Sequence, residues 1–126
     1  MQRGSYILVL EDDSATGAMV ADVLTDAGYT VHAVLDASNA RAALAVRFPA
    51  LLLCDLHLAG TSGLALASEA RAAGFDGPII LMTADTPAIQ QLDLSPVTYW
   101  LHKPFELSEL LSCVATYIGI PSDANL

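Results

Sequence analysis

Basic residues are scarce in this sequence. Its 126 residues include 5 lysines and arginines against 14 aspartates and glutamates, which gives a formal net charge of −9. A field of that sign repels nucleic acid and anionic membrane surfaces, and it favours cations or basic partner surfaces. No stretch of the sequence concentrates basic residues. We therefore expect no direct binding to nucleic acid and no binding to a membrane.

Cysteines and long apolar stretches are also few. Cys54 and Cys113 are the two cysteines, and such sparse use is typical of reduced core thiols in a cytoplasmic protein. No apolar run approaches the roughly 18 residues that a membrane-spanning helix needs. The first run, YILVL (6–10), is too short for a signal peptide, and acids follow it at once. These features predict a cytoplasmic protein.

What the sequence has in plenty is apolar residues, which make up 54% of the chain. A chain of this length and composition supports one domain with a sizeable core. We expect a single domain over residues 1–126, with its core over about 5–119 and a short C-terminal tail at 120–126.

Short apolar runs alternate with helical patterns along the chain. The runs predict five strands, at 6–10, 29–34, 51–54, 79–82 and 97–101. Apolar residues recur at helical spacing between and after them, and Pro87 and Pro96 predict that the fourth helix is short or irregular. The alternation predicts an α/β fold, a doubly wound parallel sheet of five strands with five helices.

Polar residues that can take part in binding or catalysis follow four of these strands. The first strand runs into EDD (11–13) and the third into Asp55, while the fourth ends at Thr83. The fifth runs into HKPF, which contains Lys103, the one lysine of the chain. Sites in parallel sheets of this kind lie at the carboxyl ends of the strands. We therefore expect these side chains to converge.

Each of these residues alone has an ordinary structural explanation. Asp12 and Asp13 would cap the first helix and complement its dipole, and Thr83 would simply end a strand. Asp55 is harder to explain, because a carboxylate at the end of a buried apolar run loses hydration unless a cation or hydrogen bonds replace the water. The coincidence of all four strand ends favours a functional site over four separate accidents.

The residue types indicate phosphoryl chemistry. Clustered carboxylates stay ionised when a cation lies between them, and hard oxygen ligands select Mg²⁺. A carboxylate is a competent nucleophile toward phosphorus and forms an aspartyl phosphate. A lysine and a hydroxyl can stabilise the charge on the transferring group. Asp55 is therefore the predicted phosphoacceptor, with Mg²⁺ as cofactor.

These motifs resemble those of a known family, the receiver domain of two-component response regulators. The resemblance spans roughly residues 5–119 and rests on the acidic pair after the first strand, Asp55 after LLLC, TAD at 83–85, and KPF at 103–105. It implies a flavodoxin-like fold and a signalling domain rather than an enzyme, with at most self-phosphorylation and autodephosphorylation.

The resemblance also implies a role for each site residue. Asp13 and Asp55 would bind Mg²⁺ directly, Asp12 through water, and His57 through its backbone carbonyl. Phosphate binding and switching would fall to four residues, Thr83, Ala84, Trp100 and Lys103, and the Lys103–Pro104 peptide bond would be cis. Trp100 departs from the family pattern, which has a tyrosine or phenylalanine three residues before the lysine.

The partners implied by the resemblance are proteins. A sensor histidine kinase or a histidine phosphotransfer protein would supply the phosphoryl group. A downstream protein partner or output domain would bind the face made by the fourth helix, fifth strand and fifth helix. A homodimer is a further expected assembly, with no face assigned to it.

Three other functions deserve comparison with this interpretation. A phosphatase that uses an aspartyl-phosphate intermediate would need a second aspartate two residues after the nucleophile, where this chain has His57. A flavin- or dinucleotide-binding domain would need a Gly- or Ser/Thr-rich phosphate loop after the first strand, where this chain has three acids. A receiver-like module that signals without phosphate is the third, and Trp100 and the unusual fourth helix favour it.

Overall fold

The computed structural model describes residues 6–84 and 92–121. In these ranges five strands form one parallel sheet in the order β2-β1-β3-β6-β7. The strands are β1 (Tyr6–Leu10), β2 (Thr30–Val34), β3 (Leu51–Asp55), β6 (Ile79–Thr83) and β7 (Tyr99–His102). The predicted five-stranded parallel sheet is therefore confirmed.

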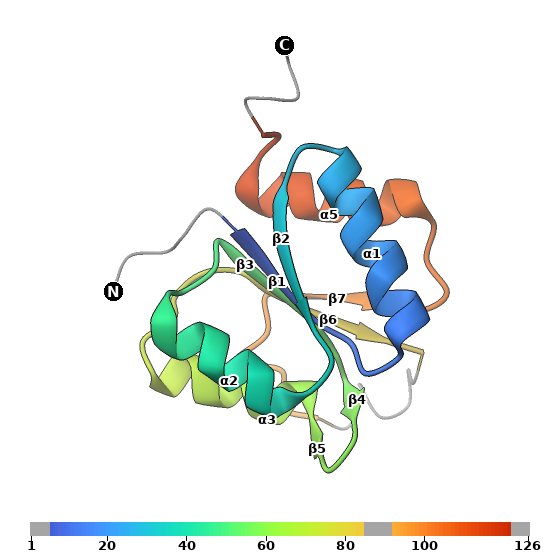
Figure 1. The fold of residues 1–126 in the computed structure, drawn as a ribbon. Helices are drawn as coiled ribbons and strands as arrows, with labels where there is room; N and C mark the ends of the chain where they lie inside the picture. The colour runs from blue at the N-terminus through green and yellow to red at the C-terminus, as the bar shows by residue number, and fades with distance from the viewer. Residues whose placement is uncertain (1–5, 85–91, 122–126) are drawn as a thin grey trace.

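Helices cover both faces of this sheet (Figure 1). The described helices are α1 (Ser14–Asp26), α2 (Ala37–Val46), α3 (Gly63–Ala72) and α5 (Leu107–Ile118). α1 and α5 lie on one face, and α2 and α3 lie on the other. The predicted doubly wound arrangement is confirmed by this layering. The sequence predicts a short or irregular fourth helix in the segment from Asp85 to Pro96, and residues 85–91 of that segment lie outside the described residues.

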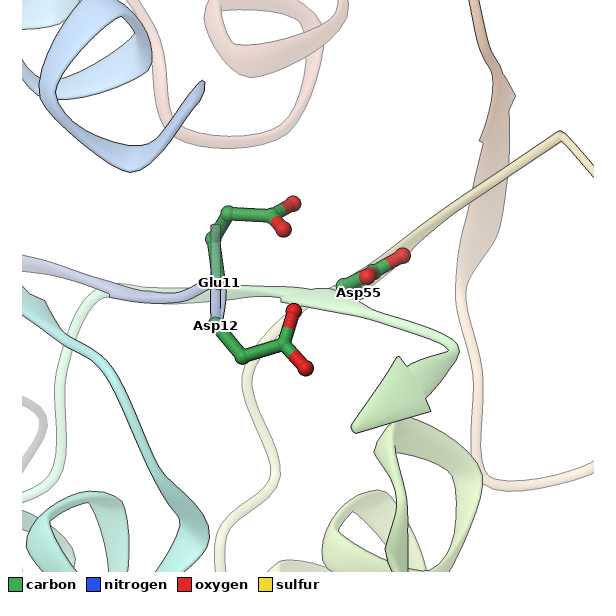
Figure 2. A group of neighbouring side chains, drawn as sticks. All are labelled: Glu11, Asp12 and Asp55. Carbon is green, nitrogen blue, oxygen red and sulfur yellow. The ribbon is translucent and has the colours of Figure 1, made fainter. Parts of the chain in front are cut away.

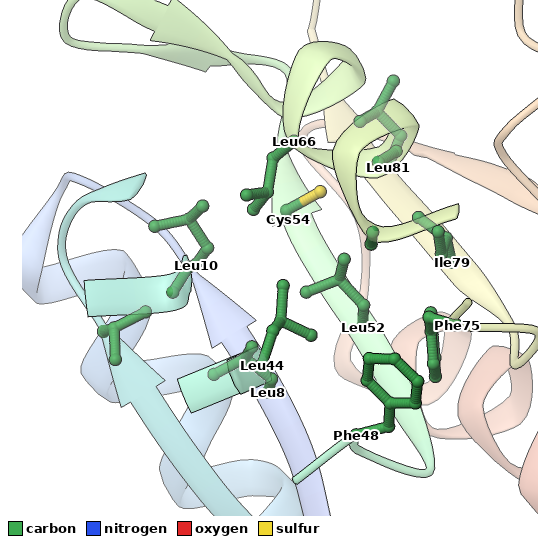
Figure 3. Close-up of a cluster of buried hydrophobic side chains, with 14 of the residues drawn as sticks. Leu8, Leu10, Leu44, Phe48, Leu52, Cys54, Leu66, Phe75, Ile79 and Leu81 are labelled. Carbon is green, nitrogen blue, oxygen red and sulfur yellow. The ribbon is translucent and has the colours of Figure 1, made fainter. Parts of the chain in front are cut away.

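The three central strands are buried on both faces because their apolar residues alternate between two cores. Leu8, Leu52 and Leu81 point into the core under α2 and α3, where Phe48 and Phe75 also pack (Figure 3). Their neighbours in sequence enter the core under α1 and α5, whose buried members include Ile7, Val9, Leu53, Ile80, Leu24 and Val114. Continuous apolar runs are the sequence signature of strands covered on both faces.

A short hairpin follows β3 and was absent from the sequence prediction. It consists of β4 (His57–Leu58) and β5 (Thr61–Ser62), which pair antiparallel. Gly60 lies at its tip with φ of 76°, a conformation that glycine adopts without steric cost. Two-residue strands give no periodic signal, so the pattern of the sequence does not reveal them.

No described helix combines the length and the apolar character needed to cross a membrane. The carboxyl ends of β1, β3, β6 and β7 lie at one edge of the sheet, and the residues that follow these ends form the candidate site.

Candidate functional site

Glu11, the residue after β1, is a buried carboxylate. Its backbone N–H donates to the Val34 carbonyl at 3.2 Å, which extends the β1–β2 ladder by one residue. Its side chain is 2% exposed, and one carboxylate oxygen accepts a hydrogen bond from Lys103 Nζ at 2.8 Å. The other oxygen accepts the Asp13 backbone N–H at 3.2 Å. Glu11 therefore ties the end of β1 to the lysine that follows β7.

Three carboxylates gather at this edge of the sheet. Oxygens of Glu11, Asp12 and Asp55 all lie within 4.8 Å of one another (Figure 2). Glu11 and Asp55 are buried, whereas Asp12 is exposed. The group therefore reaches from the protein interior to the solvent.

The sequence predicts Asp13 in this group, and the structure has Glu11 there instead. Asp13 is the N-cap of α1, and its side chain accepts hydrogen bonds from the backbone N–H of Thr16, at 3.2 Å, and from the Thr16 hydroxyl. These hydrogen bonds lower the pKa of Asp13. The carboxylates that gather beside Asp55 are therefore Glu11 and Asp12, one residue toward the N-terminus from the expected pair, and which acids bind a metal stays a prediction. One sequence feature does indicate Glu11 as a member of the carboxylate group: it directly follows the last apolar residue of the strand.

Asp55 is the last residue of β3 and is 8% exposed. It pairs with Met82 in the parallel ladder between β3 and β6. One of its carboxylate oxygens lies 3.4 Å from Lys103 Nζ. The ammonium group of Lys103 therefore supplies part of the compensation that a buried carboxylate needs for lost hydration, whereas the neighbouring acids add negative charge.

Lys103 is held by its backbone as well as by its charge. Its N–H donates to the Thr83 carbonyl at 2.8 Å, and its peptide bond to Pro104 is cis. Burial alone would lower the pKa of Lys103, but the hydrogen bond to Glu11 and the charge of Asp55 outweigh burial, so the pKa is raised. Lys103 therefore stays protonated while it spans Glu11 and Asp55.

The remaining predicted residues surround this centre. Thr83 is fully buried at the end of β6, and the exposed Ala84 follows it. Trp100 is half-buried on β7, where it packs against the core beneath α2 and α3. Its ring meets His102 edge-on, with 6.1 Å between centroids. His57 is exposed at the start of the β4–β5 hairpin.

Cys54, adjacent to the site, has the properties of a core thiol. It is fully buried, and burial together with the charge of Asp55 raises its pKa to about 12. A thiol with so high a pKa has almost no thiolate at neutral pH and is a poor nucleophile.

The carboxylate group suits a hard divalent cation. Its three acids and the one ammonium of Lys103 leave two negative charges uncompensated. The ligand atoms that these side chains offer are all oxygens, which Mg²⁺ prefers. The exposed Asp12 leaves room for the water ligands that Mg²⁺ keeps. The residues present therefore fit a magnesium ion.

The fold and the site can now be compared with those of known proteins. The model of the response regulator receiver domain family matches residues 7–115. The chain belongs to this family, whose members are the receiver domains of two-component systems.

Curated relatives agree with this assignment. The chain is 33% identical over 109 residues to the transcriptional regulatory protein DltR of Streptococcus agalactiae, a match that covers 84% of this chain and 48% of that protein. It is 34% identical over 114 residues to the phosphate regulon transcriptional regulatory protein PhoB of Pseudomonas aeruginosa, a match that covers 86% of this chain and 49% of that protein. The chain thus spans about half the length of these relatives.

Solved structures share the fold. The chemotaxis protein CheY4 of Vibrio cholerae superposes with a TM-score of 0.83 at 26% identity, over 90% of this chain and 98% of that one. The response regulator TrrA of Thermotoga maritima, in complex with Mg²⁺ and BeF, superposes with a TM-score of 0.82 at 26% identity, over 93% of this chain and 99% of that one.

Proposed function

We propose that Asp55 accepts a phosphoryl group from a phosphohistidine of a sensor histidine kinase or a histidine phosphotransfer protein. The observation that supports this most is the placement of Asp55, a buried carboxylate at a strand end, 3.4 Å from Lys103 and within a group of acids suited to a cation. The proposed Mg²⁺ ligands are the side chains of Glu11, Asp12 and Asp55 and the backbone carbonyl of His57.

The chain's own residues would divide the reaction as follows. A carboxylate oxygen of Asp55 attacks phosphorus, and the P–N bond of the donor phosphohistidine breaks with its electron pair staying on the ring nitrogen. The imidazole leaves as the neutral ring after it takes a proton from solvent. Lys103 Nζ, already between Glu11 and Asp55, is placed to hold a phosphoryl oxygen. Mg²⁺ bound by the carboxylates would neutralise negative charge on the transferring group. TrrA, the related protein with Mg²⁺ and BeF in its structure, supports this assignment by analogy.

The switch proposed for this chain starts at Thr83. Its hydroxyl would donate to a phosphoryl oxygen on Asp55, and Ala84 would contribute its backbone. Trp100, two positions before the residue paired with Thr83, would then adjust its packing. A downstream protein or output domain would recognise the face that includes β7 and α5, and a second copy of this chain would be a further partner. We further propose that residues 1–126 act as one cytoplasmic receiver domain.

Treatment with acetyl phosphate and Mg²⁺ tests this function. Intact-protein mass spectrometry should show one added phosphoryl unit, which hydroxylamine removes because an acyl phosphate is a reactive mixed anhydride. Asp55→Asn should take up none, whereas Asp36→Asn, a change at the exposed N-cap of α2, should be labelled normally. Undiminished labelling of Asp55→Asn would reject the assignment. A wild-type chain that takes up no phosphoryl group would favour the module that signals without phosphate.

A further inference from the structure

Gly63, the first residue of α3, lies directly against the backbone of Asp55. A Cβ atom at position 63 would lie 2.1 Å from the Asp55 carbonyl oxygen and 3.0 Å from its carbonyl carbon. Real Cβ atoms essentially never come closer than 3.0 Å to another atom. Because protein interiors are close-packed, no side chain fits at position 63 while both backbones keep their places.

Both backbones in this contact are held by other hydrogen bonds. Asp55 pairs with Met82 in the ladder, and the next N–H, that of Leu56, donates to the Met82 carbonyl at 2.8 Å. The Gly63 N–H donates to the Leu56 carbonyl at 2.8 Å, and Ser62 caps α3. The Asp55 carbonyl cannot move away without disturbing the sheet, and Gly63 cannot move away without opening this bond or displacing the helix.

The same contact closes the base of the β4–β5 hairpin. The hydrogen bond between Gly63 and Leu56 joins the residue after the hairpin to the residue before it, and His57 pairs with Ser62 one step further out. His57 is the proposed carbonyl ligand. The close contact between Gly63 and the Asp55 backbone therefore fixes both ends of the segment 56–62, which contains the β4–β5 hairpin.

We propose that Gly63 is a positioning residue for the phosphoacceptor. Its missing side chain lets α3 begin against the Asp55 peptide, and this approach holds Asp55 and the His57 carbonyl in the geometry that receives phosphate and Mg²⁺. The inference rests on the proposed function of Asp55. A methyl group at position 63 displaces one backbone by about 1 Å, and a misplacement of that size costs roughly 10²-fold in the rate of a reaction that depends on alignment.

Gly63→Ala tests this role, with Gly74→Ala as the matched control. In Gly63→Ala the rate of Asp55 labelling by acetyl phosphate at saturating Mg²⁺ should fall roughly 10²-fold. Mg²⁺ affinity, measured by calorimetry, should fall about tenfold or more, as on loss of groups that orient metal ligands. Gly74 has φ of 105°, and a Cβ atom there would have the Phe48 side chain as its nearest contact, at 4.0 Å. Alanine at position 74 is therefore strained but remote from Asp55. Gly74→Ala should lower the Tm and leave both values unchanged.

The outcomes separate this inference from the proposed function. Wild-type labelling and affinity in a folded Gly63→Ala protein would overturn the inference, and so would equal losses in Gly74→Ala. A wild-type chain that takes up no label would reject the proposed function, and the comparison of Mg²⁺ affinities would then decide the role of Gly63 alone.

A measurement on the wild-type chain covers the case in which Gly63→Ala fails to fold. Mg²⁺ should slow hydrogen exchange of the Gly63 amide, which is bonded to the Leu56 carbonyl beside the site. The Gly74 amide, bonded to the Arg71 carbonyl at the far end of α3, is the reference. Equal protection of both amides by Mg²⁺ would overturn the inference.

Discussion

Replacing Lys103 with methionine is expected to lower the free energy of unfolding by roughly 3 kcal/mol in the absence of divalent cations. The lysine is 2.8 Å from Glu11 and 3.4 Å from Asp55, and both acids are buried. Methionine keeps the apolar stem but leaves two buried carboxylates without a cation, and removal of one partner from a buried ion pair is costly. Denaturant unfolding in EDTA measures the loss.

Mg²⁺ should reverse most of this loss. Lys103 and the metal interact with the same carboxylates, so the variant should bind Mg²⁺ at least as tightly as the wild-type chain. At a concentration of 100 times Kd, binding to the folded state alone stabilises by about 2.7 kcal/mol. The control is Arg41→Met, which removes an exposed ion pair with Glu69 and should change stability by less than about 1 kcal/mol. Equal effects of the two changes would contradict the importance of charge compensation at Lys103.

Glu11→Gln is expected to lower Mg²⁺ affinity by roughly 10- to 100-fold. Glutamine nearly preserves the size of the side chain, so the change removes one negative charge from the group formed with Asp12 and Asp55. With less charge at the site, cation binding weakens, and labelling of Asp55 at a fixed low Mg²⁺ concentration should fall with it. Titration calorimetry gives the affinity directly.

Asp13→Asn is the matched control for Glu11→Gln. Asp13 stands two residues away and caps α1 outside the carboxylate group. Asparagine is also a good N-cap residue, so stability and Mg²⁺ affinity should both stay close to those of the wild-type chain. A large loss of affinity in Asp13→Asn with none in Glu11→Gln would instead support the pair expected from the sequence, Asp12 and Asp13.

Much of the fold is readable from the sequence because the central strands are buried on both faces. The runs YILVL, LLLC and IILM are continuous and short, and β1, β3 and β6 follow them to within a residue. The parallel order then places Asp55, Thr83 and Lys103 at one edge. Convergence of these residues needed no information beyond the alternation of strands and helices.

The register of the acidic run is what the sequence could not decide. Three acids follow β1, and their side chains point in different directions as the chain turns from strand to helix. The outcome depends on two local contacts: the Glu11 N–H continues the ladder to Val34, and Thr16 engages Asp13 as a cap. The role of Gly63 was hidden for a similar reason, because the β4–β5 hairpin that returns it to Asp55 has no periodic signal.

Identification of the modified residue tests the central claim most directly. After treatment with acetyl phosphate and Mg²⁺, reduction with borohydride converts an aspartyl phosphate to homoserine, and mass spectrometry of peptides locates the product. We expect homoserine at position 55 in the wild-type chain, none when EDTA replaces Mg²⁺, and none in Asp55→Asn. Homoserine at Asp12 or Asp13 in place of Asp55, or equal product with and without Mg²⁺, would contradict the claim.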